Sequence, residues 1–170
     1  YDFKKNLEAN TALCEAAEKL DEEPDVISAF HQLQDLHQQY REIGPVAKEL
    51  REQIWSRFKA ASTVINKKHQ QYFEEIRSKE EKNLEHKTAL CEKLEAIDLD
   101  AIKTAAQWET TTKEVIAMQQ EWREIGFAPQ KMNVQIFERF RTINDVFFSK
   151  KAEFFKELKS QYSSNLEKKQ

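Results

Sequence analysis

The chain is poor in the residues that make turns. Of its 170 residues, 2 are glycine and 3 are proline, whereas ordinary chains carry about 7% and 5% of these residues. Turns and hairpins draw on both residue types, so the sequence has room for few of them. Long apolar runs are also missing: no stretch approaches the about 18 consecutive apolar residues that a membrane-spanning helix needs. We therefore expect few turns and no membrane partner.

Charge of one sign and paired cysteines are missing too. The net charge is -3, which gives no overall bias toward nucleic acid or membrane surfaces. Cys14 and Cys91 lie far apart and form no CxxC motif, so we expect reduced core thiols in a cytoplasmic protein. Charged residues make up 34% of the chain, but 39% of it is hydrophobic, which is enough to bury a core. This balance is typical of long helices with solvated faces.

An internal repeat is the strongest pattern in the sequence. Motifs in the first half recur with offsets of 77 and then 82 residues, which places a five-residue insertion between Leu94 and about Trp108. The recurring segments are 6–8 and 83–85, 11–15 and 88–92, and 41–44 and 123–126. We interpret residues 1–82 and 83–164 as two three-helix repeats, and residues 165–170 as the start of a third.

Apolar residues spaced three and four apart predict the helices of each repeat. The first helix is expected from about Phe3 to Leu20, and the second carries Val26 to Ile43. In the second repeat, the second helix is expected to carry Ile102, Trp108 and further apolar residues to Ile125. The third helix of the first repeat is predicted to continue into the first helix of the next, from about Lys48 to Leu94. The expected fold is all-α, with a spectrin-like connection and an elongated molecule.

Both glycines occupy the same place in the repeat, directly after the second helix. Gly44 follows Ile43, and Gly126 follows Ile125. Because glycine is the usual residue of a left-handed helix cap, we expect a left-handed backbone conformation at both positions.

An aromatic-Arg-Glu-Ile-Gly corner, followed by an aromatic-x-Arg-Phe helix, resembles the bacterial domain-of-unknown-function family numbered 349. The resemblance covers about residues 26–82 and 108–164, with Tyr40 where that family usually has tryptophan. It implies a bacterial, intracellular, multi-repeat protein and brings no activity. We interpret the motif as structural, with Arg123 capping carbonyl groups at its helix end. Its residues are Tyr40, Arg41, Ile43, Gly44, Trp55, Phe58, Trp122, Arg123, Ile125, Gly126, Phe137 and Phe140.

Local charge alternates along the chain. Residues 1–45 carry four basic and ten acidic side chains, and residues 46–79 carry eight and four. Residues 80–130 carry six and eleven, and residues 131–159 carry seven and four. The basic third helices either pair with the acidic helices of their own repeat or form a stripe that binds phosphates. The first explanation is favoured. The stripe would consist of Arg57, Lys59, Lys67, Lys68, Arg139, Arg141 and Lys150.

No group of residues has the pattern of an active site. The four histidines do not recur between the repeats, and both glycines are already assigned to helix ends, which leaves none for a phosphate loop. We therefore expect no catalytic residue, no cofactor, no metal and no small-molecule substrate. The preferred function is a non-enzymatic scaffold or protein-interaction module in a bacterial cytoplasm. The alternative is a nucleic-acid or ribosome-associated factor. The histidines are His31, His37, His69 and His86.

Overall fold

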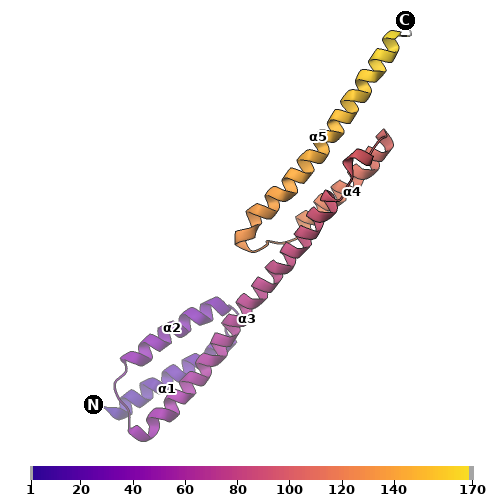
Figure 1. The fold of residues 1–170 in the computed structure, drawn as a ribbon. Coiled ribbons are helices and arrows are strands. Elements are labelled where there is room, and N and C mark those ends of the chain that lie inside the picture. Colours follow the sequence, from indigo (N-terminus) through magenta and orange to yellow (C-terminus); the bar gives the residue numbers. More distant parts are fainter. Residues whose placement is uncertain (1, 169–170) are drawn as a thin grey trace. The chain divides into compact units, whose positions relative to one another are not determined.

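The computed structural model describes residues 2–168, and these residues form helices without any strand. The all-α fold class is therefore confirmed (Figure 1). In chain order the elements are α1 (Phe3–Lys19), η1 (Leu20–Glu22), α2 (Val26–Glu42), α3 (Lys48–Glu95), η2 (Leu99–Ala101), α4 (Ala105–Glu124) and α5 (Gln130–Lys168).

One uninterrupted helix joins two compact units. The described chain divides after Ile76, and α3 runs through this point as a single helix of 48 residues. The predicted continuity from about Lys48 to Leu94 is confirmed. An isolated apolar stripe cannot hold so long a helix, so its two parts depend on the helices that pack against them.

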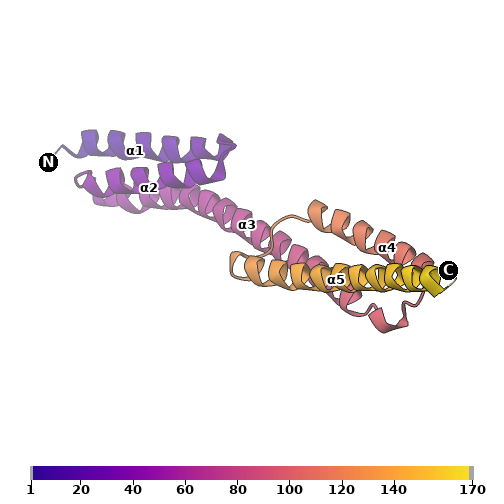
Figure 2. The same cartoon turned by 90° about the horizontal axis from the view of Figure 1, so that it is seen from above.

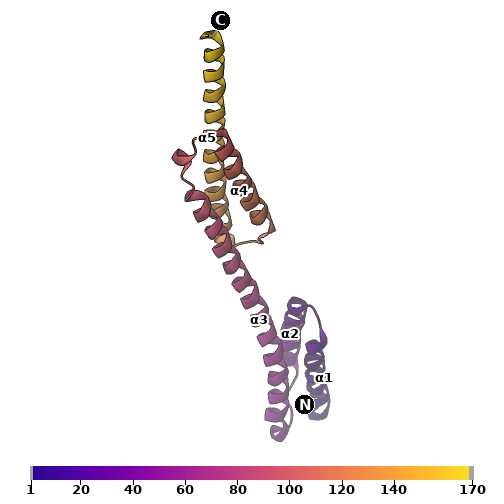
Figure 3. The ribbon, with the colours of Figure 1, turned by 90° about the vertical axis from the view of Figure 1, so that its right-hand side faces the viewer.

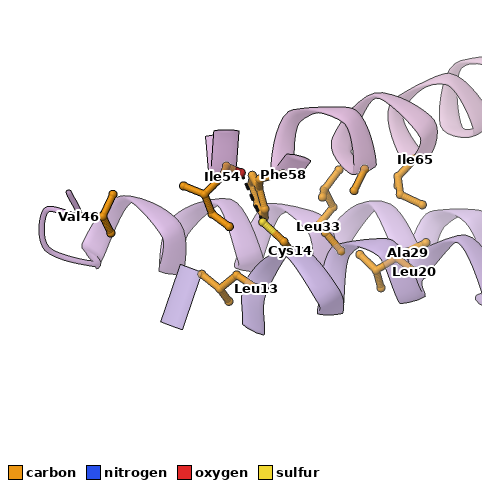
Figure 4. Packing of buried hydrophobic residues seen from close by; sticks show 11 residues of the cluster. Leu13, Cys14, Leu20, Ala29, Leu33, Val46, Ile54, Phe58 and Ile65 are labelled. Atoms are coloured by element: carbon orange, nitrogen blue, oxygen red, sulfur yellow. Dashed lines mark hydrogen bonds between the residues drawn. The ribbon is translucent and has the colours of Figure 1, made fainter. Parts of the chain in front are cut away.

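The first unit is built from α1, α2 and the first part of α3, which lie side by side in all three ribbon views (Figures 1, 2 and 3). Asp25 starts α2, since its carboxylate accepts hydrogen bonds from the backbone N–H groups of Ile27 and Ser28. Figure 4 shows the core between the three helices. Its buried residues are Leu13, Cys14, Ala17, Leu20, Ala29, Leu33, Val46, Ile54, Phe58, Ala61 and Ile65.

The second unit is built from the last part of α3, α4 and α5. Thr104 and Gln107 form a capping box at the start of α4. The prediction that this helix includes Ile102 is wrong: Ile102 ends the short helix η2 and lies in the connection, where the extra residues of the second half are found. The buried core residues of the unit are Cys91, Leu94, Trp108, Val115, Ala128, Ile136, Phe140 and Phe147.

The glycine prediction is also wrong. Neither Gly44 nor Gly126 has a positive φ, and α2 and α4 end at Ile43 and Ile125 in extended conformations. The glycines are needed for space. A Cβ on Gly44 would lie 2.8 Å from Nδ2 of Asn6. The Asn6 amide uses that space to donate a 2.8 Å hydrogen bond to the Pro45 carbonyl.

The same contact occurs in the second unit. Nδ2 of Asn83 donates a 2.9 Å hydrogen bond to the Phe127 carbonyl, and a Cβ on Gly126 would lie 2.9 Å from that nitrogen. In both units, therefore, an asparagine of the first helix forms a hydrogen bond to the backbone of the corner that follows the second helix.

None of the described helices combines the length and the apolar character that crossing a membrane requires.

Candidate functional site

The predicted basic stripe lies mainly against acidic side chains of the same unit. Arg57 donates two hydrogen bonds to the Glu18 carboxylate, at 3.1 and 2.8 Å. Arg139 binds Glu95 in the same way, at 3.1 and 2.5 Å. These bidentate contacts lower the pKa of each carboxyl group, chiefly through the arginine hydrogen bonds. Both arginines thus join the third helix of a unit to its first.

Lysines further along the third helices repeat this pattern. Lys68 pairs with the Asp21 carboxylate and also donates to the Asp21 carbonyl. Lys150 lies 3.9 Å from the Asp100 carboxylate. These side chains are partly exposed, and that of Asp100 is almost fully exposed. Each pair therefore contributes little stability but reduces the positive charge available to phosphates.

The remaining members of the stripe do not extend this row. Arg141 pairs with Glu138 on its own helix at 2.6 Å, and Lys59 and Lys67 are exposed. Residues two apart on a helix face nearly opposite directions, so Lys59 cannot share a surface with Arg57. Within neither unit, therefore, do all the basic residues of the predicted stripe share one face of the third helix.

The recurring motif packs aromatic rings beside each corner. In the first unit, Tyr40 lies 4.6 Å from Phe58 and 5.4 Å from Trp55, measured between ring centroids. In the second unit, Trp122 stacks on Phe140 at 4.0 Å. These rings join the second helix of each unit to the third.

The arginines of the motif, Arg41 and Arg123, are exposed. Among the described residues, Arg123 forms no hydrogen bond to a helix-end carbonyl. The capping role expected for it is therefore absent from this structure.

A polar bridge joins the same two helices in each unit. Nε2 of His37 and Oγ of Ser62 share a 2.5 Å hydrogen bond, and burial lowers the pKa of His37. At the positions 82 residues later, Gln119 donates to Asn144 at 2.8 Å. Because an amide pair replaces the histidine in the second unit, the bridge is structural and needs no titratable group.

A cleft of about 410 Å³ opens beside the corner of the first unit. Its polar wall contains Asn10, which is 5% exposed and whose Oδ1 atom has no hydrogen-bond partner. A buried acceptor without a donor is costly. The Oδ1 atom itself is buried and is not exposed to the cleft. The lining residues are Asn10, Tyr40, Ile43, Gly44, Pro45, Val46, Arg51, Glu52, Ile54 and Trp55.

The second unit has a lysine at the position of Asn10. Lys87 lies 77 residues after Asn10, the offset that relates the first helices of the two halves. Its side chain is 8% exposed, and its ammonium nitrogen lies 5.0 Å from the centroid of the Trp122 ring. Trp122 is the equivalent of Tyr40, which lines the cleft of the first unit, so Lys87 places a cation on the aromatic ring at the corresponding position.

Apolar side chains gather near the corner of the second unit. Phe127 is 80% exposed, Val134 70% and Phe137 50%. Phe137 also lines a cleft of about 470 Å³ together with Trp122 and Arg123. We call Phe127, Val134 and Phe137 the α4–α5 corner surface. Val134 and Phe137 are neighbours on α5, and contiguous exposed apolar side chains are typical of interaction sites.

The cysteines lie in the cores. Both are buried and form no disulfide, and Sγ of Cys14 donates a 3.5 Å hydrogen bond to the Ile54 carbonyl (Figure 4). Burial raises the pKa of both thiols. Within residues 2–168, no His, Cys, Asp and Glu side chains cluster as metal ligands.

Sequence reasoning did not identify Asn10, Lys87 or the α4–α5 corner surface. One signal was present: the offset of 77 residues pairs a small amide with a lysine on otherwise apolar helix faces. It gains meaning only when both side chains are known to be buried and Lys87 is known to lie over the Trp122 ring.

Together, these features define an all-helical protein with apolar and aromatic surfaces beside interhelical corners. The sequence matches the family described as Domain of Unknown Function (DUF349) over residues 1–49, 53–131 and 135–170. The chain therefore belongs to this family, as its corner motif suggested. The second and third matches begin 82 residues apart, which is the offset of the internal repeat. No curated protein and no solved structure matches the chain.

Proposed function

We propose that this chain is a non-enzymatic protein-interaction module of a bacterial cell, and that it acts in the cytoplasm. The observation that carries the proposal is the α4–α5 corner surface, where Phe127 and Val134 are 80% and 70% exposed. Buried cysteines without a disulfide agree with a reducing compartment.

The mechanism is the burial of this surface by a partner protein. Val134 and Phe137 are three residues apart on α5, so their side chains are neighbours on the helix. Burying one fully exposed phenylalanine is worth about 1.5–3 kcal/mol. A few such side chains on a preformed helix can therefore anchor a partner, because little ordering of the module is required.

Site-specific photo-crosslinking in cells tests the proposal. A photoreactive amino acid replaces Phe127, and the control replaces Ile116, an α4 side chain that is 47% exposed. We expect a discrete adduct from position 127 that is missing from position 116. If both positions give the same adducts, or neither gives any, the corner surface is not a partner site.

Nucleic-acid binding ranks second. Arg57, Lys68, Arg139 and Lys150 already pair with carboxylates of their own unit. Fluorescence anisotropy of labelled single-stranded RNA and duplex DNA, at two salt concentrations, compares the two functions. We expect no binding at low salt, whereas micromolar binding that collapses at high salt would place nucleic acid first.

A further inference from the structure

Lys87 is a buried cation for which the described residues supply no anion. Its side chain is 8% exposed, and its nitrogen lies 5.0 Å from the centroid of the Trp122 ring. It forms no hydrogen bond or ion pair with the described part of the chain, and burial lowers its pKa without an opposing carboxylate. Glu121, the acidic neighbour of Trp122, binds Nε2 of His86 instead, at 2.7 Å. The charge of Lys87 is therefore unfavourable in the free protein.

The Lys87 side chain lies between the Trp122 ring and the corner of the second unit. Lys87 follows Asn83 by four residues on α3, so the two side chains share a helix face, and long helical side chains lean toward the preceding turn. That turn meets the corner, because Asn83 donates its hydrogen bond to the Phe127 carbonyl. The Lys87 nitrogen is not one of the fully buried polar atoms without a partner, so it reaches the surface at this corner.

Trp122 connects Lys87 to the α4–α5 corner surface. Trp122 and Phe137 line the same cleft of about 470 Å³, and Phe137 belongs to that surface. Residues 122–137 carry two basic side chains and one acidic one, and Lys87 adds a third positive charge. In a chain whose net charge is -3, this corner therefore combines exposed apolar side chains with a local excess of positive charge, which is complementary to an acidic partner.

We propose that the polypeptide that covers the α4–α5 corner surface carries an aspartate or glutamate, and that its carboxylate pairs with the Lys87 ammonium group. This inference rests on the proposed function, because it gives the chemistry of the partner that the corner surface binds. The partner's apolar side chains cover Phe127, Val134 and Phe137, and the carboxylate beside them supplies the anion that Lys87 lacks.

A single carboxylate fits this place better than the phosphates of a nucleic acid. Nucleic-acid binding depends on several cations that meet a row of phosphates, whereas the corner offers one buried ammonium group beside exposed apolar side chains. Because Lys87 is already desolvated in the free protein, binding adds only the desolvation of the partner's carboxylate. Apolar side chains that exclude water around the pair also strengthen the attraction.

Selection from a random heptapeptide display library tests the proposal. The library is presented to the unaltered protein and, in parallel, to Lys87→Met, which keeps an apolar side chain of similar length but lacks the charge. We expect the peptides selected by the unaltered protein to contain an aspartate or glutamate next to an apolar residue. This enrichment should disappear with Lys87→Met. It should persist with Lys113→Met, the matched control, which removes the charge of an exposed lysine on α4.

Calorimetric titration then measures one selected peptide and its counterpart in which the side-chain amide replaces the carboxylate. Removing either the carboxylate or the Lys87 charge should weaken binding roughly ten- to hundredfold, and removing both should weaken it hardly further. Thermal unfolding followed by circular dichroism checks the free protein. Lys87→Met should keep or raise the melting temperature, because it removes a buried charge that has no partner in the described chain.

Four results would overturn the inference: no selected peptide, selected peptides without acidic residues, equal binding of the amide counterpart, or a lower melting temperature of Lys87→Met, which would make Lys87 a stabilising part of the fold. Binding of labelled single-stranded RNA that depends on Lys87 would overturn the assignment to a carboxylate.

Phe127→Ser separates this inference from the proposed function. Peptides whose binding depends on Phe127 but not on Lys87 would refute the inference and leave the corner surface standing as a partner site. Conversely, acidic peptides whose binding depends on Lys87 but not on Phe127 would refute the proposed role of the corner surface and leave the pairing of Lys87 with a carboxylate standing.

Discussion

Replacing Gly44 by alanine should have an effect whose sign depends on Asn6. The added Cβ would lie 2.8 Å from Nδ2 of Asn6, so the Asn6 side chain must move and its hydrogen bond to the Pro45 carbonyl is lost. The loss of such a bond costs about 0.5–1.5 kcal/mol. Opposing this, alanine restricts the unfolded chain and returns about 0.4–1 kcal/mol where φ is not positive. The net effect of Gly44→Ala therefore lies between a stabilisation of about 0.5 kcal/mol and a destabilisation of about 1 kcal/mol.

A double-mutant cycle isolates the contact. In an Asn6→Ala background no amide remains to be displaced, so Gly44→Ala should stabilise the protein by about 0.4–1 kcal/mol. Urea unfolding, followed by circular dichroism at 222 nm, measures all four proteins. The pair Asn83 and Gly126 provides the same cycle in the second unit. An equal cost of Gly44→Ala in both backgrounds would refute the spatial explanation and require a backbone one.

Three further predictions concern titratable groups. Because Arg139 lowers the pKa of Glu95 below its ordinary value of 4.5, the pair adds stability above that pH and loses it as the pH falls through the lowered value. In Arg139→Gln, the melting temperature should fall less steeply as the pH is lowered through the acid range. An unchanged slope would contradict the prediction. Burial and the charge of Arg41 lower the pKa of His37 below 6.5. The folded state therefore loses stability as the pH falls below 6.5, because the unfolded chain binds a proton that the folded one does not. His37→Gln should remove this loss, as measured by urea unfolding at several pH values between 5 and 8. Cys14 and Cys91 are buried with raised pKa values, so Ellman's reagent should react with them only at the rate of unfolding; rapid reaction in the native protein would exclude their burial.

Much of the fold follows from local patterns. Apolar spacing and the absence of Gly and Pro between Val46 and Gln107 were sufficient to predict α1, α2 and the continuous α3. The same approach failed at Ile102. Its apolar side chain fits the helical spacing, but the residue lies before Thr104, where α4 begins. Burial of an apolar residue in a connection gives the same sequence signal as burial on a helix.

The candidate sites were less predictable. The basic residues were found from sequence, but their partners were not: Glu18 and Glu95 are two of many acidic residues on their helices. Only packing determines which carboxylate meets Arg57 or Arg139. The exposure of Phe127 was also hidden, since an aromatic residue after a helix end is as compatible with a core as with a surface.

By itself, the sequence determined the helical class, the long α3 and the recurrence of the corner motif, because helix formation and helix ends depend on neighbours within a few residues. The tertiary structure decided what the recurring residues do. It showed that Gly44 is not a left-handed cap, and that its missing side chain leaves space for Asn6. It also placed Lys87 on the Trp122 ring while leaving the Asn10 oxygen unpaired. These outcomes depend on contacts between residues about 35 to 40 positions apart, and local periodicity carries no information about such contacts.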